Sequence, residues 1–265
     1  MTAFFKNPES KKSSDKPPFF ILGCVRSGTT MLRDVIASHP LLFCPNETHF
    51  FRYADPFGTL PYARPFLNAK LFEEHRRLDN ISEEMFRQKI YPGAKTRREL
   101  MERYGEAYLK AQNAPPGSRW FDKTPQHAFG AFLLAHQFPT AQFIHIVRHP
   151  LNVIASLRTS KKVMHIEKAI PAANYWYESL TMMKALKSSV PDRFFEIRYD
   201  TFTENPQSSI AEIFDFIDED PDQLTFHLRD IHREKNKFTK VLETEDISIA
   251  RGICGELAKE YGFEF

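Results

Sequence analysis

The spacing of apolar residues along the chain predicts short buried strands that alternate with amphipathic helices. A strand covered on both faces of a parallel sheet is a short, almost continuous apolar run, whereas a helix has apolar residues at every third or fourth position. Runs of the first kind occupy residues 19–24, 41–44 and 142–147, and residues 193–198 predict a further strand. Helical spacing predicts helices over residues 28–39, 150–161 and 170–188 and after Asn205-Pro206. This alternation indicates an α/β domain with a mostly parallel sheet.

The region between residues 52 and 117 is long, charged and rich in aromatic residues, and it has helical signals of its own. Thr96 and Glu99 form the pattern of a capping box ahead of apolar residues on one helix face. Residues 119–122 are expected to end a strand, and Thr124-Pro125 supplies a cap and a first-turn proline for the next helix. The residues after about 220 predict no definite element.

Order is expected to begin at Pro17-Pro18. Residues 1–17 are polar and rich in Lys and Ser, so we predict a disordered tail followed by one domain over residues 18–265. The tail lacks the apolar centre of a signal peptide, and no apolar run approaches the length of about eighteen residues that predicts a membrane span.

Composition excludes several classes of protein. Lys and Arg number 36 against 34 Asp and Glu, a formal net charge of +2, which gives no reason to expect a nucleic-acid partner. Three cysteines, Cys24, Cys44 and Cys254, are too few and too scattered for a disulfide framework or a zinc site. We therefore expect a soluble, cytoplasmic globular protein without a metal centre.

The segment between the first predicted strand and the first predicted helix carries the strongest chemical signal. Residues 23–30 read Gly-Cys-Val-Arg-Ser-Gly-Thr-Thr, with two glycines five positions apart and a hydroxyl residue two positions after the second. Backbone N–H groups in a loop of this spacing, backed by a helix N-terminus, form a cradle for an anion. Arg26 adds a cation inside the loop.

Position 29 carries threonine where nucleotide triphosphatases with such a loop have lysine. Those enzymes also use an acidic residue, usually at the end of a buried strand, to help hold Mg²⁺. The run over residues 142–147 ends instead in Arg148. The loop is therefore predicted to bind an anion without a metal ion. An ATP-dependent kinase with a degenerate loop and a non-catalytic nucleotide-binding module are the alternatives.

The loop Arg26-Ser27-Gly28-Thr29-Thr30 resembles that of the PAPS-dependent sulfotransferases, in the version found in tyrosylprotein and many bacterial enzymes. PAPS is 3′-phosphoadenosine 5′-phosphosulfate, and its desulfated product is PAP. The family's second motif, a strand ending in Arg with Ser eight residues later, is matched by Arg148 and Ser156. The resemblance covers about residues 18–220. It implies a P-loop-like, three-layer α/β/α fold with a helical insertion at the acceptor site.

The same resemblance assigns the cofactor contacts. It implies that residues 26–30 bind the 5′-phosphosulfate and that Arg148 and Ser156 hold the 3′-phosphate. The sequence independently places Arg148 at the carboxyl end of a strand, where ligands bind in open α/β sheets, and Ser156 about 9–12 Å along the following helix.

The resemblance also implies catalytic groups. Glu47, in Pro45-Asn46-Glu47-Thr48-His49, matches a family glutamate that is the proposed base for the acceptor, although a loop carboxylate that caps the next turn or pairs with Arg26 is the plainer alternative. His49 is the second candidate for the base, because aryl sulfotransferases use histidine. Lys123 lies in a segment similar to the family's lysine that contacts the transferring sulfonate. A lysine at a helix N-terminus is electrostatically unfavourable, which favours an anionic ligand there.

The expected activity is direct in-line transfer of a sulfuryl group from PAPS to an acceptor hydroxyl or amine, with Glu47 as base and with Lys123 and Arg26 offsetting the charge. Residues 52–117 are expected to shape the acceptor pocket, but their composition does not separate small molecules, carbohydrates and peptides. The basic segment 229–240 could close over the cofactor or be an ordinary solvated surface. Tyr199-Asp200 resembles a family segment that supports the fold, and the oligomeric state is left open.

Overall fold

The computed structural model of the chain describes residues 14–160, 166–227, 231 and 238–265. Most of the tail and most of the basic segment 229–240 therefore lie outside the described residues.

Four strands form the central sheet. They are β1 (Phe19–Leu22), β4 (Asp122–Lys123), β5 (Gln142–Val147) and β6 (Phe194–Arg198), in the order β4-β1-β5-β6. Every neighbouring pair is parallel, so all four carboxyl ends lie at one edge of the sheet. A second, two-stranded parallel sheet pairs β2 (Leu42–Phe43) with β3 (Arg119–Trp120).

Helices occupy most of the remaining described chain. The helices after β1 and β2 are α1 (Thr29–Ile36), α2 (Leu60–Asn68), α3 (Lys70–Leu78), α4 (Glu83–Met85), η1 (Phe86–Ile90) and α5 (Arg97–Ala111). Those after β4 and β5 are η2 (Pro125–Gly130), α6 (Ala131–Gln137), α7 (Pro150–Thr159), α8 (Ala169–Ser189) and η3 (Pro191–Arg193). Those after β6 are α9 (Tyr199–Glu204), α10 (Pro206–Ile217), η4 (Pro221–Gln223), α11 (Phe238–Val241) and α12 (Thr244–Glu260).

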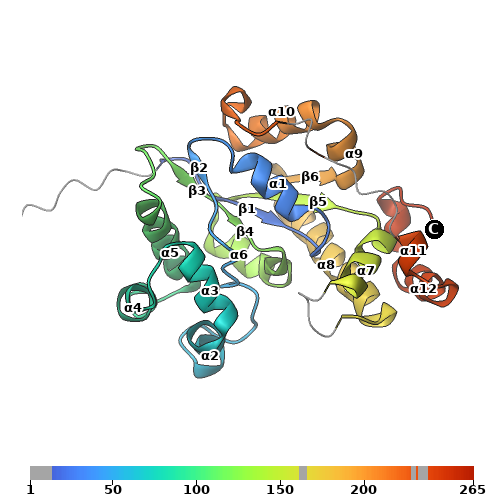
Figure 1. Ribbon diagram of the computed structural model, residues 1–265, viewed down its shortest axis with the longest axis horizontal. Coiled ribbons are helices and arrows are strands. Elements are labelled where there is room, and N and C mark those ends of the chain that lie inside the picture. Colours follow the sequence, from blue (N-terminus) through green and yellow to red (C-terminus); the bar gives the residue numbers. More distant parts are fainter. Residues whose placement is uncertain (1–13, 161–165, 228–230, 232–237) are drawn as a thin grey trace, which may run out of the picture.

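The alternation of side chains along the strands divides the core into two layers. Phe20 and Phe143 pack with residues of α5, α6 and α8, whereas Phe19 and Ile144 pack with residues of α1, α9 and α10. Figure 1 shows α1, α9 and α10 on one side of the sheet and α6 and α8 on the other. The predicted three-layer α/β/α fold with a parallel sheet is thus confirmed.

The helical insertion contains α2 to α5, and its core is continuous with one face of the sheet. Tyr62, Phe66 and Tyr104 belong to the same buried cluster as Phe20 and Trp120. The insertion therefore packs directly against this face of the sheet.

Local differences from the sequence predictions have physical causes. Residues 119–122 do not form one strand, because Arg119–Trp120 pairs with β2 and Asp122–Lys123 pairs with β1. The expected capping box is split. Glu99 N–H donates to the Thr96 hydroxyl (3.1 Å), but the Glu99 carboxylate accepts from the N–H of Lys95 (2.8 Å).

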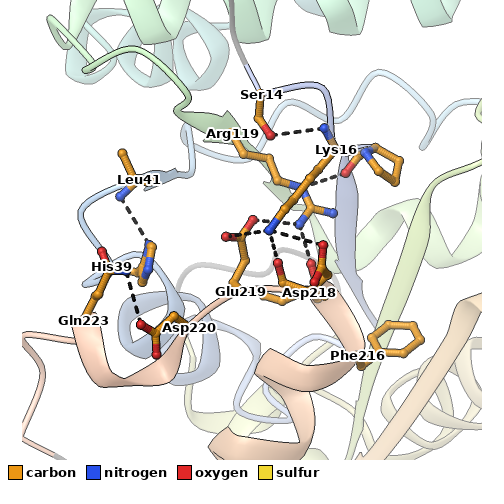
Figure 2. A network of polar contacts seen from close by, with 12 residues as sticks. Ser14, Lys16, His39, Leu41, Arg119, Phe216, Asp218, Glu219, Asp220 and Gln223 are labelled. Atoms are coloured by element: carbon orange, nitrogen blue, oxygen red, sulfur yellow. Dashed lines mark hydrogen bonds and ion pairs between the residues drawn. The ribbon is translucent and has the colours of Figure 1, made fainter.

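The amino end of the sheet is held by a buried arginine. Residues 14–17, at the end of the expected tail, are described and lie at this end. Arg119 donates to the carbonyls of Pro17 (2.6 Å) and Ile217 (2.7 Å), and Lys16 forms an ion pair with Glu219 (3.2 Å; Figure 2). Among the described residues, no helix is long and apolar enough to cross a membrane.

Candidate functional site

The phosphate loop leaves β1 in a conformation that glycine and a left-handed arginine make possible. Gly23 has φ 139°, Arg26 φ 70° and Gly28 φ 100°, all in the region that L side chains rarely adopt. A Cβ on Gly28 would lie 2.6 Å from the ring of Tyr199, so the glycine is also needed for close packing against α9. These constraints fix the path of the chain into α1.

The loop and the start of α1 offer donors suited to a phosphate group. Within the described part of the chain, no side chain caps α1, which begins at Thr29. The hydroxyl of Ser27 is buried and has no hydrogen-bond partner among the described residues. Unused N–H groups at a helix N-terminus, next to a buried hydroxyl, fit an anionic ligand.

The two predicted 3′-phosphate residues lie against this loop. Arg26 Nε donates to the hydroxyl of Ser156 in α7 (2.9 Å), and Arg148 donates to the carbonyl of Arg26 (3.2 Å). The guanidinium of Arg148 stacks over the ring of Tyr199 at 4.3 Å. Arg26 thus forms one cationic group at the carboxyl edge of the sheet with Arg148 and Ser156, which follow it by 122 and 130 residues.

Glu47 and Lys123 form an ion pair at the same edge. Lys123 Nζ lies 2.5 Å from Glu47 Oε1 and 3.4 Å from the hydroxyl of Thr30, at the start of α1. His49 Nε2 lies 3.4 Å from the other carboxylate oxygen of Glu47. The lysine therefore joins the loop after β2 to the phosphate loop.

Electrostatics keep Glu47 ionised. Burial alone would raise its pKa, but the adjacent imidazole of His49 and the positive charge of Lys123 lower the pKa of Glu47 to about 2. Burial lowers the pKa of His49, which favours the neutral imidazole. At neutral pH the group is a carboxylate paired with Lys123 beside a neutral histidine.

A buried aspartate fixes the segments that carry this pair. Asp122 accepts from the hydroxyls of Thr48 (2.8 Å) and Thr124 (3.1 Å), and it lies 3.0 Å from His127 Nδ1. The Thr124 hydroxyl also accepts the N–H of Thr48 (3.0 Å). Thr124 stands at the N-cap of η2 with Pro125 in the first turn, as predicted, but its hydroxyl does not cap the helix because it is used in this network.

The predicted residues form two neighbouring groups. Arg26, Arg148 and Ser156 make one group, and Glu47, Lys123 and Thr30 make the other. In the part of the chain that the structure describes, no hydrogen bond or ion pair joins Arg26 to Glu47. The carboxylate is thus paired with Lys123 and not, as the plainer alternative had it, with Arg26.

One pair of aromatic residues with no distinguishing sequence motif joins η2 to α8. Phe129 of η2 and Tyr175 of α8 meet edge to face, with ring centroids 5.2 Å apart. Burial raises the pKa of Tyr175, which keeps its phenol protonated. No sequence signal distinguishes these two rings from the many aromatic residues of the core.

Comparisons with known proteins agree on one family. The model of a family described as the sulfotransferase family matches residues 17–223. The omega-hydroxy-beta-dihydromenaquinone-9 sulfotransferase Stf3 of Mycobacterium bovis is 24% identical over 304 aligned positions, covering 94% of this chain and 76% of that protein. The nodulation protein NoeE of Sinorhizobium fredii is 26% identical over 157 residues, covering 57% of this chain and 33% of NoeE.

A solved structure agrees in fold. The sulfotransferase domain of the Synechococcus PCC 7002 olefin synthase superposes with a TM-score of 0.64 at 22% identity, over 99% of this chain and all of that one. The chain spans only part of several relatives, including a quarter of a matching Aquifex aeolicus protein.

Proposed function

The chain belongs to the sulfotransferase family, and from that premise we propose that it transfers a sulfuryl group from PAPS to a hydroxyl or amine of an acceptor. The observation that carries the proposal is the contact between the lysine-free phosphate loop and the pair Arg148 and Ser156. A nucleotide with phosphate at both its 5′ and 3′ positions matches two anion sites joined in this way.

Each anion site has its own donors. The loop residues 26–30 and the first turn of α1 would hold the 5′-phosphosulfate, with Arg26 as the cation. Arg148 and Ser156 would hold the 3′-phosphate. The buried Ser27 hydroxyl, which has no partner among the described residues, would gain one from the bound anion.

Bound PAPS supplies the sulfuryl group and a stable bisphosphate leaving group. Glu47 accepts the proton of the attacking acceptor group, and Lys123 offsets negative charge on the group in transfer. His49, 3.4 Å from Glu47, is the alternative base and otherwise orients the carboxylate.

The ion pair between Glu47 and Lys123 implies that anion binding precedes proton transfer to Glu47. With its pKa at about 2, Glu47 is a weak base as long as Lys123 lies against it. An anion that draws Lys123 away removes the strongest nearby positive charge and raises the pKa of the carboxylate. We therefore propose that Glu47 becomes an effective base only when an anionic group occupies the site.

The test is thermal unfolding with PAP and, separately, with Mg·ATP at matched concentration. A ligand that binds only the folded state raises the melting temperature. At a hundredfold excess over Kd it adds about 2.7 kcal/mol to the free energy of unfolding. PAP should stabilise the protein, and Arg148→Ala should abolish most of this effect.

The control is a variant at an exposed arginine away from the candidate site, measured by the same thermal unfolding. Arg64→Ala, an exposed arginine of α2, should leave the PAP effect unchanged. Stabilisation by Mg·ATP alone would contradict the proposal and favour an ATP-dependent kinase. PAP binding without turnover of PAPS on a panel of hydroxyl and amine acceptors would favour a non-catalytic module.

A further inference from the structure

His149 uses both of its ring nitrogens at the start of α7. Its Nδ1 accepts the backbone N–H of Leu151 (3.2 Å), so the side chain caps the helix. Its Nε2 lies 2.7 Å from the carbonyl oxygen of Glu264, which can only accept, so Nε2 must carry the hydrogen. The two bonds together require one neutral tautomer, and they join the helix to the C-terminal segment.

The C-terminal segment, residues 261–265, packs around this imidazole. The ring of His149 lies 5.2 Å from that of Phe263 and 5.8 Å from that of Phe265, and it stacks on Phe238 at 6.0 Å. Arg198, at the end of β6, donates to the carbonyl of Tyr261 (2.9 Å). Its guanidinium also covers the ring of Phe263 at 4.3 Å. The segment is therefore fixed to the carboxyl ends of β5 and β6.

His149 lies between the two residues that are proposed to hold the 3′-phosphate. The residue before it is Arg148, and Ser156 lies in the helix that it caps. The carbonyl of Arg148 is itself held by the indole N–H of Trp176 in α8 (2.9 Å). The turn between β5 and α7 thus has a support on each side, one from α8 and one from the C-terminal segment.

We propose that His149 is a positioning residue that fixes Arg148 and Ser156 for the 3′-phosphate by tying the start of α7 to residues 261–265. The inference rests on the proposed function, because it assumes that these two residues bind that phosphate. It assigns the C-terminal segment a part in cofactor selectivity.

The electrostatic surroundings agree with the neutral tautomer. Burial lowers the pKa of His149, and the positive charge of Arg198 acts in the same direction. The Glu264 carbonyl and the negative charge of Asp200 oppose these effects without reversing them. The imidazole is thus neutral at pH 7, as the helix cap requires.

The experiment compares two nucleotides by titration calorimetry. PAP carries the 3′-phosphate, and adenosine 5′-monophosphate does not. His149→Ala removes both bonds and should raise the Kd for PAP about tenfold, the effect expected for a lost helix cap at a binding site, while the Kd for the monophosphate changes less than about twofold. His136→Ala, at an exposed position in α6, is the matched control and should change neither.

A conservative variant separates the two bonds. In His149→Asn the side-chain oxygen can still cap α7 but cannot reach Glu264 as the imidazole does, so the Kd for PAP should rise only about threefold. Phe263→Leu should weaken PAP binding in the wild-type background and add little in His149→Ala, because both changes release the same segment.

The inference would be overturned if the Kd values for both nucleotides rose equally in His149→Ala, or if neither rose. An equal rise would indicate a general loss of structure, which affects both nucleotides alike whether or not they carry a 3′-phosphate. Should His149→Ala fail to fold, His149→Asn is judged by the same criterion. A wild-type protein that does not bind PAP would overturn the proposed function and the inference with it.

Discussion

Lys123 is nearly buried, yet the carboxylate that neutralises it is also the candidate base. An ammonium placed beside a group in transfer stabilises charge that develops only in the transition state. Removing such a group lowers turnover more than it lowers ground-state affinity.

Lys123→Ala should therefore reduce sulfuryl transfer from PAPS at least about a hundredfold while changing the Kd for PAP less than about threefold. Transfer to the best acceptor of a panel and calorimetry with PAP measure the two quantities. Lys259→Ala, on the exposed face of α12, is the control. Near-normal turnover in Lys123→Ala would remove this residue from the catalytic group.

The pKa of Glu47 has a consequence for stability. Its value of about 2 lies below the ordinary 4.5, so ionised Glu47 stabilises the fold above pH 4.5, and this contribution is lost as the pH falls from 4.5 toward 2. In Lys123→Met the carboxylate loses its cation, and its pKa should rise. The free energy of unfolding, measured in urea between pH 5 and pH 3, should then depend less steeply on pH. Identical slopes in the two proteins would show that Lys123 does not depress this pKa.

The sequence could indicate which residues belong to the site but not how they pair. Glu47 and Lys123 follow from motifs, whereas their 2.5 Å contact depends on the parallel pairing of β1 with β4. Thr124 occupies the N-cap position of η2 as its pattern predicts, but its hydroxyl donates to Asp122, because a buried carboxylate needs donors. No local pattern announces that need, since the partner Thr48 lies far away in sequence.

Two glycines lie inside long helices, but one is packed against a neighbouring side chain and the other faces open space. Gly105 lies in α5 with the indole of Trp120 against it, and a Cβ there would come within 2.6 Å of the ring. Gly252 lies in α12, where a Cβ would meet nothing within 4 Å. Helix propensity alone favours alanine at both positions by about 0.5–1 kcal/mol.

Gly252→Ala should therefore stabilise the protein by about 0.5–1 kcal/mol, and Gly105→Ala should destabilise it by about 1–3 kcal/mol through overpacking. Urea unfolding of the two variants measures both effects, and each serves as the control for the other. Stabilisation by Gly105→Ala would mean that the packing of α5 on Trp120 relaxes freely.

Elements with a clear pattern were predictable. Residues 142–147 form β5 as expected, because a mostly apolar run of only six residues favours a buried strand over a helix. The split of residues 119–123 between two sheets was not predictable, since it is decided by partners in distant segments. Helix α12 was missed although Ala250, Cys254 and Ala258 have helical spacing, and Glu243 and Asp246 form its capping box.

For the molecule as a whole, one end of the central sheet carries the candidate site and the other end stabilises the fold. The carboxyl end carries the candidate site, and the amino end is held by Arg119, which also donates to Gln142 (2.8 Å) and lies over the ring of Phe19 at 4.8 Å. Removing this buried guanidinium would leave its carbonyl and side-chain acceptors without a donor, which lowers the free energy of unfolding.

Arg119→Met should destabilise the protein by about 3 kcal/mol and leave the Kd for PAP within about twofold of the wild-type value. Urea unfolding and calorimetry at a temperature where the variant is folded test both parts. Loss of PAP affinity in a folded variant would mean that the two ends of the sheet are coupled.

The order of strands in the central sheet has a consequence for synthesis. Strand β1 is entirely apolar and lies between β4 and β5, which begin 100 and 120 residues after its end. At about 5–20 residues per second, the ribosome would need roughly 5–20 s to supply either neighbour. During that time β1 is an unpaired strand open to association with other chains, and Lys16 with Pro17-Pro18 stands directly before it, where charge and missing N–H groups oppose such pairing. The nascent chain should therefore depend on chaperones until β5 emerges.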